Sequence, residues 1–268
     1  MNHAHFLPAE SEGQSRSAHA PSHTCGESIF SERQPDSTVT LVRDEDGQGL
    51  ALYCSERETP RDDVRGKRSE IHRLLVERLF RALGELSASE ELFEILGADS
   101  AHDIEVTSGP LGKPRLLVDG TDSLSVSFTH GRGRIWAALG LPRYSVGIDV
   151  AEKREFHSTY PFARAFYDEE LGRIRERMGG TSSQAAALIW SAKEAAVKAL
   201  GCGFHLLDPL DLRVTLTSRR ANHFLLSVQL IPSSQDRRVR APRGGLPARA
   251  TQEDAYWLSV CAVSLPAL

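Results

Sequence analysis

Two short stretches place charged side chains where apolar segments would otherwise continue. The run "VGID" is apolar and β-branched and ends in the carboxylate of Asp149, where a strand is expected to leave its sheet. The run "WSAKEAAVKALG" places Glu194 and Lys198 four residues apart in an alanine-rich helix. Carboxylates that converge from a strand end and a helix suit Mg²⁺, which is typically shared with a phosphate. With a lysine to balance phosphate charge, these three residues predict phosphate chemistry.

The helix predicted over residues 183–200 also allows a simpler interpretation of its charges. At about 100° per residue, one side of this helix is apolar and should face a core; it carries Leu188, Ala192, Ala195 and Ala199. Glu194 and Lys198 lie on a different face. There a solvent-exposed pair would contribute only about 0.3–0.5 kcal/mol. The helix alone favours this interpretation, and the acidic strand end at Asp149 shifts the balance towards a site.

The composition bounds the class of protein. With 32 basic and 36 acidic residues the net charge is -4, so no strong field recruits nucleic acid. The sequence contains no run of 18 apolar residues and no signal-like segment near Met1, which predicts no membrane span. The cysteines are scattered without metal-ligand spacing, which favours a reducing compartment and a cytoplasmic protein; they are Cys25, Cys54, Cys202 and Cys261.

The chain divides by composition into a leader and two blocks. Residues 1–37 are rich in Ser, His, Pro and Gly, and we expect them to be a disordered leader. The histidines of this leader are irregularly spaced, which favours a flexible tail over a metal-binding site. Residues 38–144 and 145–268 each mix helix and strand patterns. This predicts an α+β fold of two similar halves, each an antiparallel sheet packed against a long helix, rather than one doubly wound sheet.

Within the first block, "STVTLV" predicts a strand, and a helix is predicted over residues 65–86. That helix has an apolar stripe formed by Ile71, Leu74, Leu75, Leu79 and Leu83. A short acidic helix is expected at residues 90–96. "GPLGKPRLLVDG" predicts a turn and a strand, and "LSVSFTHGRGRIWAALGL" predicts two strands joined by a Gly-Arg-Gly turn.

The second block begins with the predicted strand "YSVGIDVAEKRE", and "TYPFARAFYDEELGRIRERM" is predicted to be helical. After the helix at 183–200, strands are expected near 212–216, 224–230 and 256–263. The last two are joined by a basic loop. Its arginine-rich segment, residues 236–249, suits either a landing patch for an acidic partner or a mobile hairpin insertion, and the insertion is favoured.

The two charged motifs resemble the paired signature of the 4'-phosphopantetheinyl transferase superfamily. "VGIDVAE" and "WSAKEAAVKALG" have the order and spacing of that signature. "GKP" looks like the first family motif, "SVSFTHGRGRIWAAL" its S-x-S-H block, and "FARAFYDEEL" the helix between the signatures. "GCGFHLLDPLDLRV" is similar to the glycine turn and strand that follow. The resemblance covers residues 60–230 and favours the surfactin-synthetase-activating type, a monomeric pseudodimer of two α+β halves.

The resemblance implies an enzyme that moves the 4'-phosphopantetheine arm of coenzyme A to a serine of an apo carrier protein. The carrier would be an acyl, peptidyl or aryl carrier of fatty-acid, polyketide or nonribosomal-peptide synthesis. Adenosine 3',5'-bisphosphate would be released. Such a transfer rests on metal neutralisation, alignment and removal of a proton.

The same resemblance assigns roles to residues of this chain. Asp149 and Glu194 would hold Mg²⁺, Glu194 would also receive the serine proton, and Lys198 would stabilise phosphate charge or poise that base. Contacts to coenzyme A are implied for His130, at its 3'-phosphate, and for Lys113, Lys193, Arg65, Lys67 and Arg68.

One position departs from the family pattern. The larger type has a metal-binding Glu two residues after the first Asp, but Ala151 stands there and Glu152 follows. Because side chains alternate along a strand, Glu152 replaces the missing metal ligand only if the chain bends after Val150. A water in place of the carboxylate is the other way to keep activity.

Two other classes of function remain open. In the first, the substitution at Ala151 leaves a coenzyme A or carrier-protein binding module without catalysis. In the second, the acids and lysines only decorate a scaffold or an oligomeric interface. A P-loop nucleotide enzyme is excluded because Lys113 is followed by Pro114 rather than Ser or Thr.

Overall fold

A computed structural model gives the arrangement of most of the chain. The described residues are 38–58, 64–86, 103–109, 112–157, 159–220, 223–231, 245–253 and 255–265. The expected leader at 1–37, the acidic helix at 90–96 and residues 236–244 of the basic segment lie outside them.

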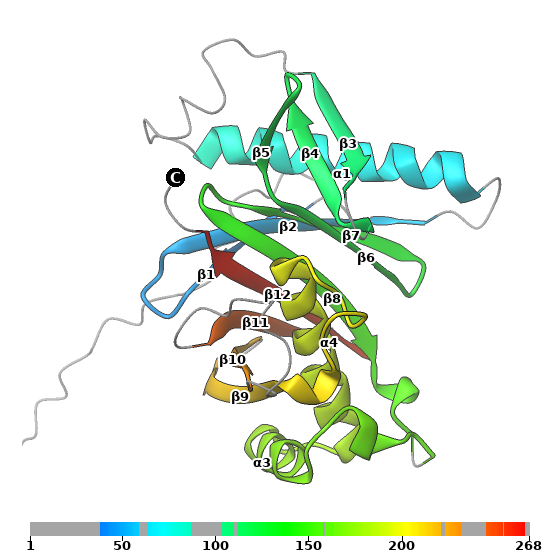
Figure 1. Ribbon diagram of the computed structural model, residues 1–268, viewed down its shortest axis with the longest axis vertical. Coiled ribbons are helices and arrows are strands. Elements are labelled where there is room, and N and C mark those ends of the chain that lie inside the picture. The colour runs from blue at the N-terminus through cyan, green and yellow to red at the C-terminus, as the bar shows by residue number, and fades with distance from the viewer. Residues whose placement is uncertain are drawn as a thin grey trace, which may run out of the picture.

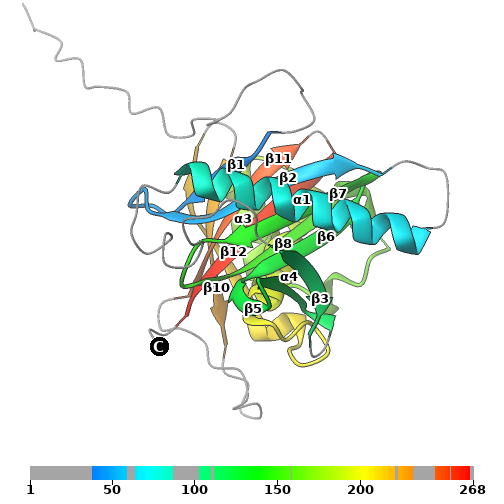
Figure 2. The same ribbon diagram turned by 90° about the horizontal axis from the view of Figure 1, so that it is seen from above.

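The first block forms an antiparallel sheet covered by a long helix. The sheet has the order β1-β2-β7-β6, and its strands are Thr40–Arg43, Gly49–Arg57, Arg134–Gly140 and Val126–Gly131. Helix α1, Val64–Leu86, crosses this sheet (Figures 1 and 2). It buries Leu75, Leu79 and Leu83 against the sheet's apolar face. The first block also has a smaller three-stranded sheet. Its strands are β3, Ile104–Ser108, β4, Pro114–Val118, and β5, Thr121–Leu124.

The second block forms a five-stranded antiparallel sheet with a long helix on one face. Its order is β8-β12-β11-β10-β9, with bounds Tyr144–Glu152, Tyr256–Ser264, Leu246–Glu253, His223–Leu230 and Leu212–Arg219. Helix α4, Ser182–Leu200, lies beside β8 and β12, and α3, Asp168–Met178, packs against α4 (Figure 1). Three short 3₁₀ turns complete this half: η2, Lys153–Glu155; η3, Phe162–Arg164; η4, Pro209–Asp211.

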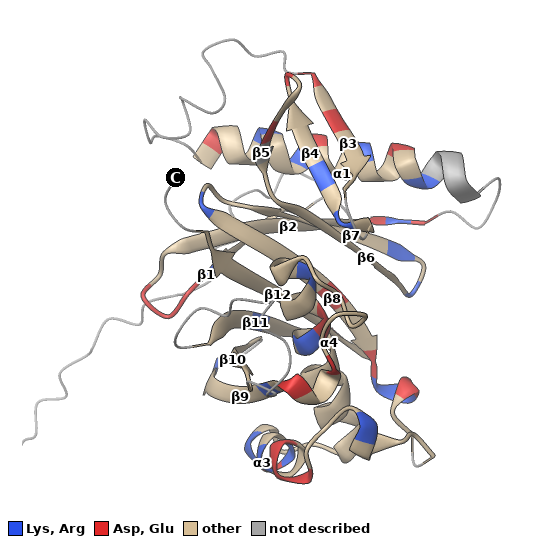
Figure 3. Ribbon diagram, in the orientation of Figure 1, with Lys and Arg blue, Asp and Glu red and all other residues tan. Residues whose placement is uncertain are grey.

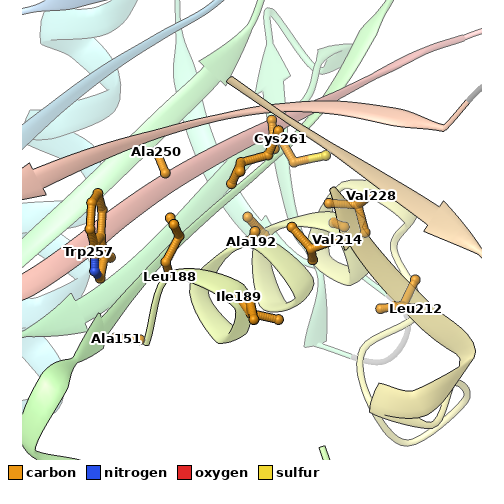
Figure 4. Packing of buried hydrophobic residues seen from close by; sticks show 14 of the residues in the cluster. Ala151, Leu188, Ile189, Ala192, Leu212, Val214, Val228, Ala250, Trp257 and Cys261 are labelled. Atoms are coloured by element: carbon orange, nitrogen blue, oxygen red, sulfur yellow. The ribbon is translucent and has the colours of Figure 1, made fainter. Parts of the chain in front are cut away.

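Helix α4 is buried on most of its circumference. A capping box between Thr181 and Gln184 starts it, and Gly201, with a φ of 75°, ends it in the left-handed conformation. The predicted apolar stripe is buried; its residues are Leu188, Ala192, Ala195 and Ala199. Figure 4 shows Leu188 beside Trp257 of the sheet, with Ala192 further along the helix towards Val214. A helix with so little solvent-facing surface has its position fixed by packing rather than by its few charges.

A second apolar layer joins the two blocks. Val146 and Ile148 of β8, on the face of that strand away from α4, pack with Trp136 and Ala138 of β7 and with Val260 of β12. Trp136 and Tyr256 meet edge to face, with centroids 5.6 Å apart. The two sheets are therefore held face to face, and β8 has one block on each side of it.

These elements confirm the α+β prediction, with an antiparallel sheet against a long helix in each block. The predicted hairpin is confirmed, and its turn has positive φ at Arg132 and Gly133. That the two halves are a related pair stays a prediction. No helix within the described ranges is long and apolar enough to cross a membrane.

Three expectations about elements were wrong. The helix predicted through residues 159–178 is confined to α3, because Pro161 precedes a 3₁₀ turn and the chain only then becomes helical. The basic loop was extended too far, since Arg249 lies inside β11, where it pairs with Val260. Leu74 was placed in the buried stripe of α1 but is 45% exposed. Strands β2, β3, β5 and β11 were not predicted.

The difference between Leu74 and Leu75 gives a matched test of the core. We expect Leu75→Ala to lower the free energy of unfolding by about 2–5 kcal/mol, because it opens a cavity in a closed cluster. Leu74→Ala, the same change one residue away, should alter it by less than about 0.5 kcal/mol. Urea denaturation of both variants measures this. Equal effects would show that α1 is not seated on the sheet as described.

Candidate active site

Strand β8 holds a buried carboxylate within its paired stretch, so the expectation that the strand leaves its sheet at Asp149 was wrong, because pairing with β12 continues to Glu152. Asp149 is 7% exposed and pairs in register with Ser259 of β12. Its Oδ1 accepts hydrogen bonds from Thr129 Oγ1 of β6, at 3.1 Å, and from Lys198 Nζ of α4, at 2.7 Å. Burial raises the pKa of Asp149, while Lys198 and Thr129 oppose that shift. Residues far apart in the sequence thus meet at one carboxylate.

The close approach of α4 to β8 makes this meeting possible. A Cβ at Gly147 would overlap the backbone carbonyl oxygen of Ala195, so a side chain there would force the helix away. One turn further along, Ser145 Oγ donates to the carbonyl oxygen of Ala199 at 2.6 Å. The glycine of "VGID" is therefore required by packing, and the close approach that it allows brings Asp149 beside α4.

Glu194 and Lys198 of α4 interact with β8 rather than only with each other, as a surface pair would. Lys198 Nζ donates to Asp149 and, at 3.1 Å, to the carbonyl oxygen of Ile148. Glu194 is half-buried; burial, with a smaller contribution from Asp149, raises its pKa to about 7, and Lys198 opposes the rise. The simpler interpretation, which the helix alone favoured, of Glu194 and Lys198 as a solvent-exposed pair therefore does not hold, and both residues lie at the Asp149 cluster. Figure 3 shows charged residues together where α4 passes β8.

The donor set of this cluster suits a cation that also binds a ligand. Asp149 and Glu194 supply carboxylate oxygens that act on each other electrostatically, and Lys198 reduces their net charge. Among the described residues no group of three or more His, Cys, Asp or Glu side chains is close enough to enclose a metal. Mg²⁺ is usually held by one or two carboxylates together with substrate phosphates and water. The pair therefore fits Mg²⁺ shared with a phosphate, and it does not form a closed protein cage.

Glu152 was predicted as a metal ligand, and the structure corrects that prediction. Strand β8 keeps its register with β12 from Tyr144 to Glu152, so the bend after Val150 does not occur. Alternation then places Glu152 on the opposite face from Asp149. Its carboxylate pairs with Arg154 at 2.5 Å and with Arg132 at 3.5 Å.

Ala151 and Glu155, which flank Glu152 in the sequence, have different surroundings. Ala151 is fully buried in the core beside α4 (Figure 4). Glu155, which sequence reasoning missed, accepts a hydrogen bond from the Glu152 backbone N–H at 3.0 Å. Burial raises the pKa of Glu155, and the charges of Glu152 and Asp149 add to that rise. Glu155 is therefore the additional acid whose charge reaches the site.

A pocket of about 530 Å³ lies between the two blocks and reaches Lys198. Its wall comes from α1, the turn before β4, β6, the end of α4 and the glycine turn after α4. The structure brings two other predicted residues, Lys113 and Arg68, to this pocket. Its cationic wall and its position beside Asp149 suit an anionic ligand.

Lys113 is held at the junction of the two blocks. Its Nζ donates to Ser145 Oγ of β8 at 3.1 Å, and its side chain lies against Gly201. Burial lowers the pKa of Lys113, and Asp122 opposes that shift. The lysine of "GKP" therefore faces the pocket from the first block while it contacts the strand that carries Asp149.

His130 lies at the α1 side of the pocket, beside a second histidine. His72 of α1 lines the pocket, and its Nε2 is 3.3 Å from Nε2 of His130. Sequence reasoning missed His72. The available signal was its spacing, since His72 follows Arg68 by four residues and therefore lies on the same face of α1. Arg65 and Lys67 lie in the first turn of α1, in a stretch whose side chains are outside the described part.

Lys193 lies away from the pocket, so the structure does not support its predicted contact with coenzyme A. It is fully buried, and its Nζ donates to Glu170 Oε2 and the carbonyl oxygen of Ala165, both at 2.9 Å, and to that of Pro209 at 3.1 Å. Burial lowers the pKa of Lys193, and Glu170 opposes this. Glu170 also accepts from the Val214 backbone N–H. Lys193 thus ties α4 to three neighbouring segments.

Replacing Lys193 should damage stability rather than ligand binding. We expect Lys193→Met to lower the free energy of unfolding by about 3–5 kcal/mol, because it leaves the Glu170 carboxylate buried without its partner. Adding Glu170→Gln should restore part of the loss. Urea denaturation measures both, and calorimetry on the folded variant should give an unchanged affinity for coenzyme A. A tenfold weaker affinity with normal stability would instead return Lys193 to the coenzyme contacts.

Comparison with known proteins gives one match. Residues 145–257 match the family model of the 4'-phosphopantetheinyl transferase superfamily. The match runs from β8 to the start of β12 and includes Asp149, Glu194 and Lys198. No curated protein matched the chain.

Proposed function

Because residues 145–257 form a domain of the 4'-phosphopantetheinyl transferase superfamily, we propose that the protein transfers the 4'-phosphopantetheine arm of coenzyme A to a carrier-protein serine. The family match supports phosphopantetheine transfer in general. One observation carries the finer proposal: Asp149 and Glu194 interact with Lys198, which lines a pocket together with Lys113 and Arg68. That arrangement provides oxygen ligands for a hard cation and cationic groups for phosphates.

In the proposed reaction, the serine oxygen forms a bond to the phosphorus that carries the pantetheine arm. The bond from that phosphorus to the oxygen bridging the two phosphates breaks, and adenosine 3',5'-bisphosphate leaves with that oxygen. Glu194 receives the serine proton, directly or through water. The charge that develops on the diphosphate is stabilised by the ammonium group of Lys198. All atoms and charges balance without an oxidant or reductant.

Asp149 and Glu194 are the residues proposed to hold Mg²⁺. When bound, Mg²⁺ neutralises phosphate charge and aligns the diphosphate for attack. Thr129 and Lys198 fix the Asp149 carboxylate through hydrogen bonds to Oδ1. Glu152 is not included, because its carboxylate points to the other face of β8 and pairs with arginines.

The remaining contacts concern the two substrates. Lys113, Arg68 and His130 are proposed to bind the anionic groups of coenzyme A, and the sequence resemblance adds Arg65 and Lys67 to this proposal. The second substrate is proposed to be an acyl, peptidyl or aryl carrier protein. That the protein is monomeric and cytoplasmic stays a prediction.

Arm transfer can be tested directly. The protein is incubated with coenzyme A, Mg²⁺ and a panel of apo carrier proteins, and intact mass reports addition of one arm to the carrier serine. We expect Glu194→Gln to slow transfer by about 10²–10⁴-fold, because it removes the proton acceptor. Lys198→Met should slow it by about 10²-fold, because it removes a cation from the diphosphate. Glu169→Gln is the matched control, since that glutamate is exposed on α3 and pairs only with Arg173 among the contacts described.

A binding module without catalysis is the second candidate function, and the positions of Ala151 and Glu152 are the observation that favours it. Ala151 is a core residue, and Glu152 faces away, so only two carboxylates remain at the proposed metal site. Binding of coenzyme A without any change in carrier mass, across the whole panel, would select this candidate. Normal transfer by Lys198→Met would contradict both the assigned site and its chemistry.

A further inference from the structure

Two histidines from different elements form a close pair at the α1 side of the pocket. His72 of α1 and His130 of β6 bring their Nε2 atoms within 3.3 Å, with ring planes inclined at 56°. The His72 ring stacks on Phe128, with centroids 4.1 Å apart and planes inclined at 21°. Phe128 and His72 both line the pocket. The stack fixes the His72 ring, and the pair places a proton-binding group at the pocket wall.

The short distance between the two Nε2 atoms allows one hydrogen bond between the rings, and this determines where the pair can bind an added proton. A hydrogen bond between two Nε2 atoms requires one ring to donate and the other to accept. In the neutral pair, the accepting ring carries its proton on Nδ1 and the donating ring has a free Nδ1 lone pair. One added proton, on that Nδ1, preserves the hydrogen bond and gives both rings an Nδ1–H. The singly charged pair is therefore the better partner for an anion.

Burial and the neighbouring cations both favour the neutral form of the pair in the free protein. Burial, followed by the charges of His130 and Arg68, lowers the pKa of His72 to about 4, and Glu58 opposes this. Burial, with Arg68 and then Lys198, also lowers the pKa of His130, and Glu58 again opposes. Arg68 itself pairs with Glu58 at 2.9 Å. An anion placed here would reverse this balance, because negative charge favours the protonated ring.

Coenzyme A carries two separate anionic groups that a single cluster does not serve. Its diphosphate is assigned above to Asp149, Glu194 and Lys198. Its phosphomonoester lies at the other end of the nucleotide and needs its own cationic partner. Within the described residues, the remaining basic groups on the α1 side of the pocket are Arg68 and the two histidines.

We propose that His72 is a further binding residue, which together with His130 takes up one proton from solvent when the phosphomonoester of coenzyme A binds. The inference rests on the proposed function, since it takes coenzyme A as the ligand. The dianion receives hydrogen bonds from the charged imidazole pair, and Arg68 adds a second cation. Because the pKa of the pair is higher in the complex than in the free protein, binding is favoured at low pH. The gain is lost as the pH rises through the pKa of the bound pair.

Calorimetry without carrier protein tests this, because it needs no turnover. Coenzyme A and 3'-dephospho-coenzyme A are titrated into the full chain at several pH values and in buffers of different ionisation enthalpy. We expect proton uptake of up to about one per coenzyme A near neutral pH and little for the dephospho form. His72→Gln should weaken coenzyme A binding about tenfold, the loss of one charge-assisted hydrogen bond, and leave the dephospho form nearly unchanged.

The variants separate the pair from the titration of the ligand itself. A phosphomonoester has a second pKa near about 6 and therefore changes charge in the same range. The titration of the free ligand is the same for all variants, so the difference in proton uptake between the parent protein and His72→Gln reports the change at the histidine site. His130→Gln should give the same difference, and the double variant should add little to either single one. His157→Gln, at an exposed histidine that contacts Thr159, is the matched control.

The outcomes distinguish this inference from the proposed function. If His72→Gln weakens both ligands equally, or leaves the proton uptake unchanged, the histidine pair has only a packing role and the inference is overturned. If neither ligand binds the parent protein, the proposed function fails. Thermal unfolding checks that each variant is folded, and His72→Asn replaces His72→Gln if the glutamine variant is not. Proton uptake that disappears in His72→Gln and His130→Gln, but not in His157→Gln, supports the proposal.

Discussion

The close packing of α4 against β8 is the constraint on which the site depends. It requires a residue without a side chain at Gly147, where the helix backbone takes the space that a Cβ would need. It is locked by the hydrogen bond from Ser145 to the carbonyl oxygen of Ala199. With the helix at this distance, Lys198 reaches Asp149 at 2.7 Å. A shift of one side-chain diameter would leave the buried Asp149 carboxylate without its ammonium partner, which a low-dielectric environment makes costly.

The two lysines of α4 differ in burial, and this difference gives one a structural role and leaves the other open to a ligand. Lys193 is completely buried and has three acceptors, Glu170 among them, so each ammonium proton is satisfied inside the fold. Lys198 is 30% exposed in its side chain and lines the pocket. About one and a half turns of α4 separate the two lysines. Lys193 therefore stabilises the second block, and Lys198 is available to a ligand.

The pocket belongs to both blocks of the chain. Its cations come from α1 and the turn before β4 on one side and from α4 on the other, and Lys113 joins the two sides through Ser145. The apolar layer around Trp136 and Ile148 holds the two sheets together. The family match covers only residues 145–257, so the wall contributed by α1 and by the histidine pair is a feature that the structure alone describes.

The sequence by itself determined the long helices, the β6–β7 hairpin and the candidate set of Asp149, Glu194 and Lys198, because periodicity, turn residues and charges at fixed spacing are local properties. The tertiary structure decided which partners those charges have. Glu152 faces away from Asp149 because strand pairing continues to its end, Lys193 is buried because α3 and η4 cover it, and His72 meets His130 because α1 crosses the sheet. These contacts join residues far apart in the chain, and their geometry depends on how layers pack, which no local pattern encodes.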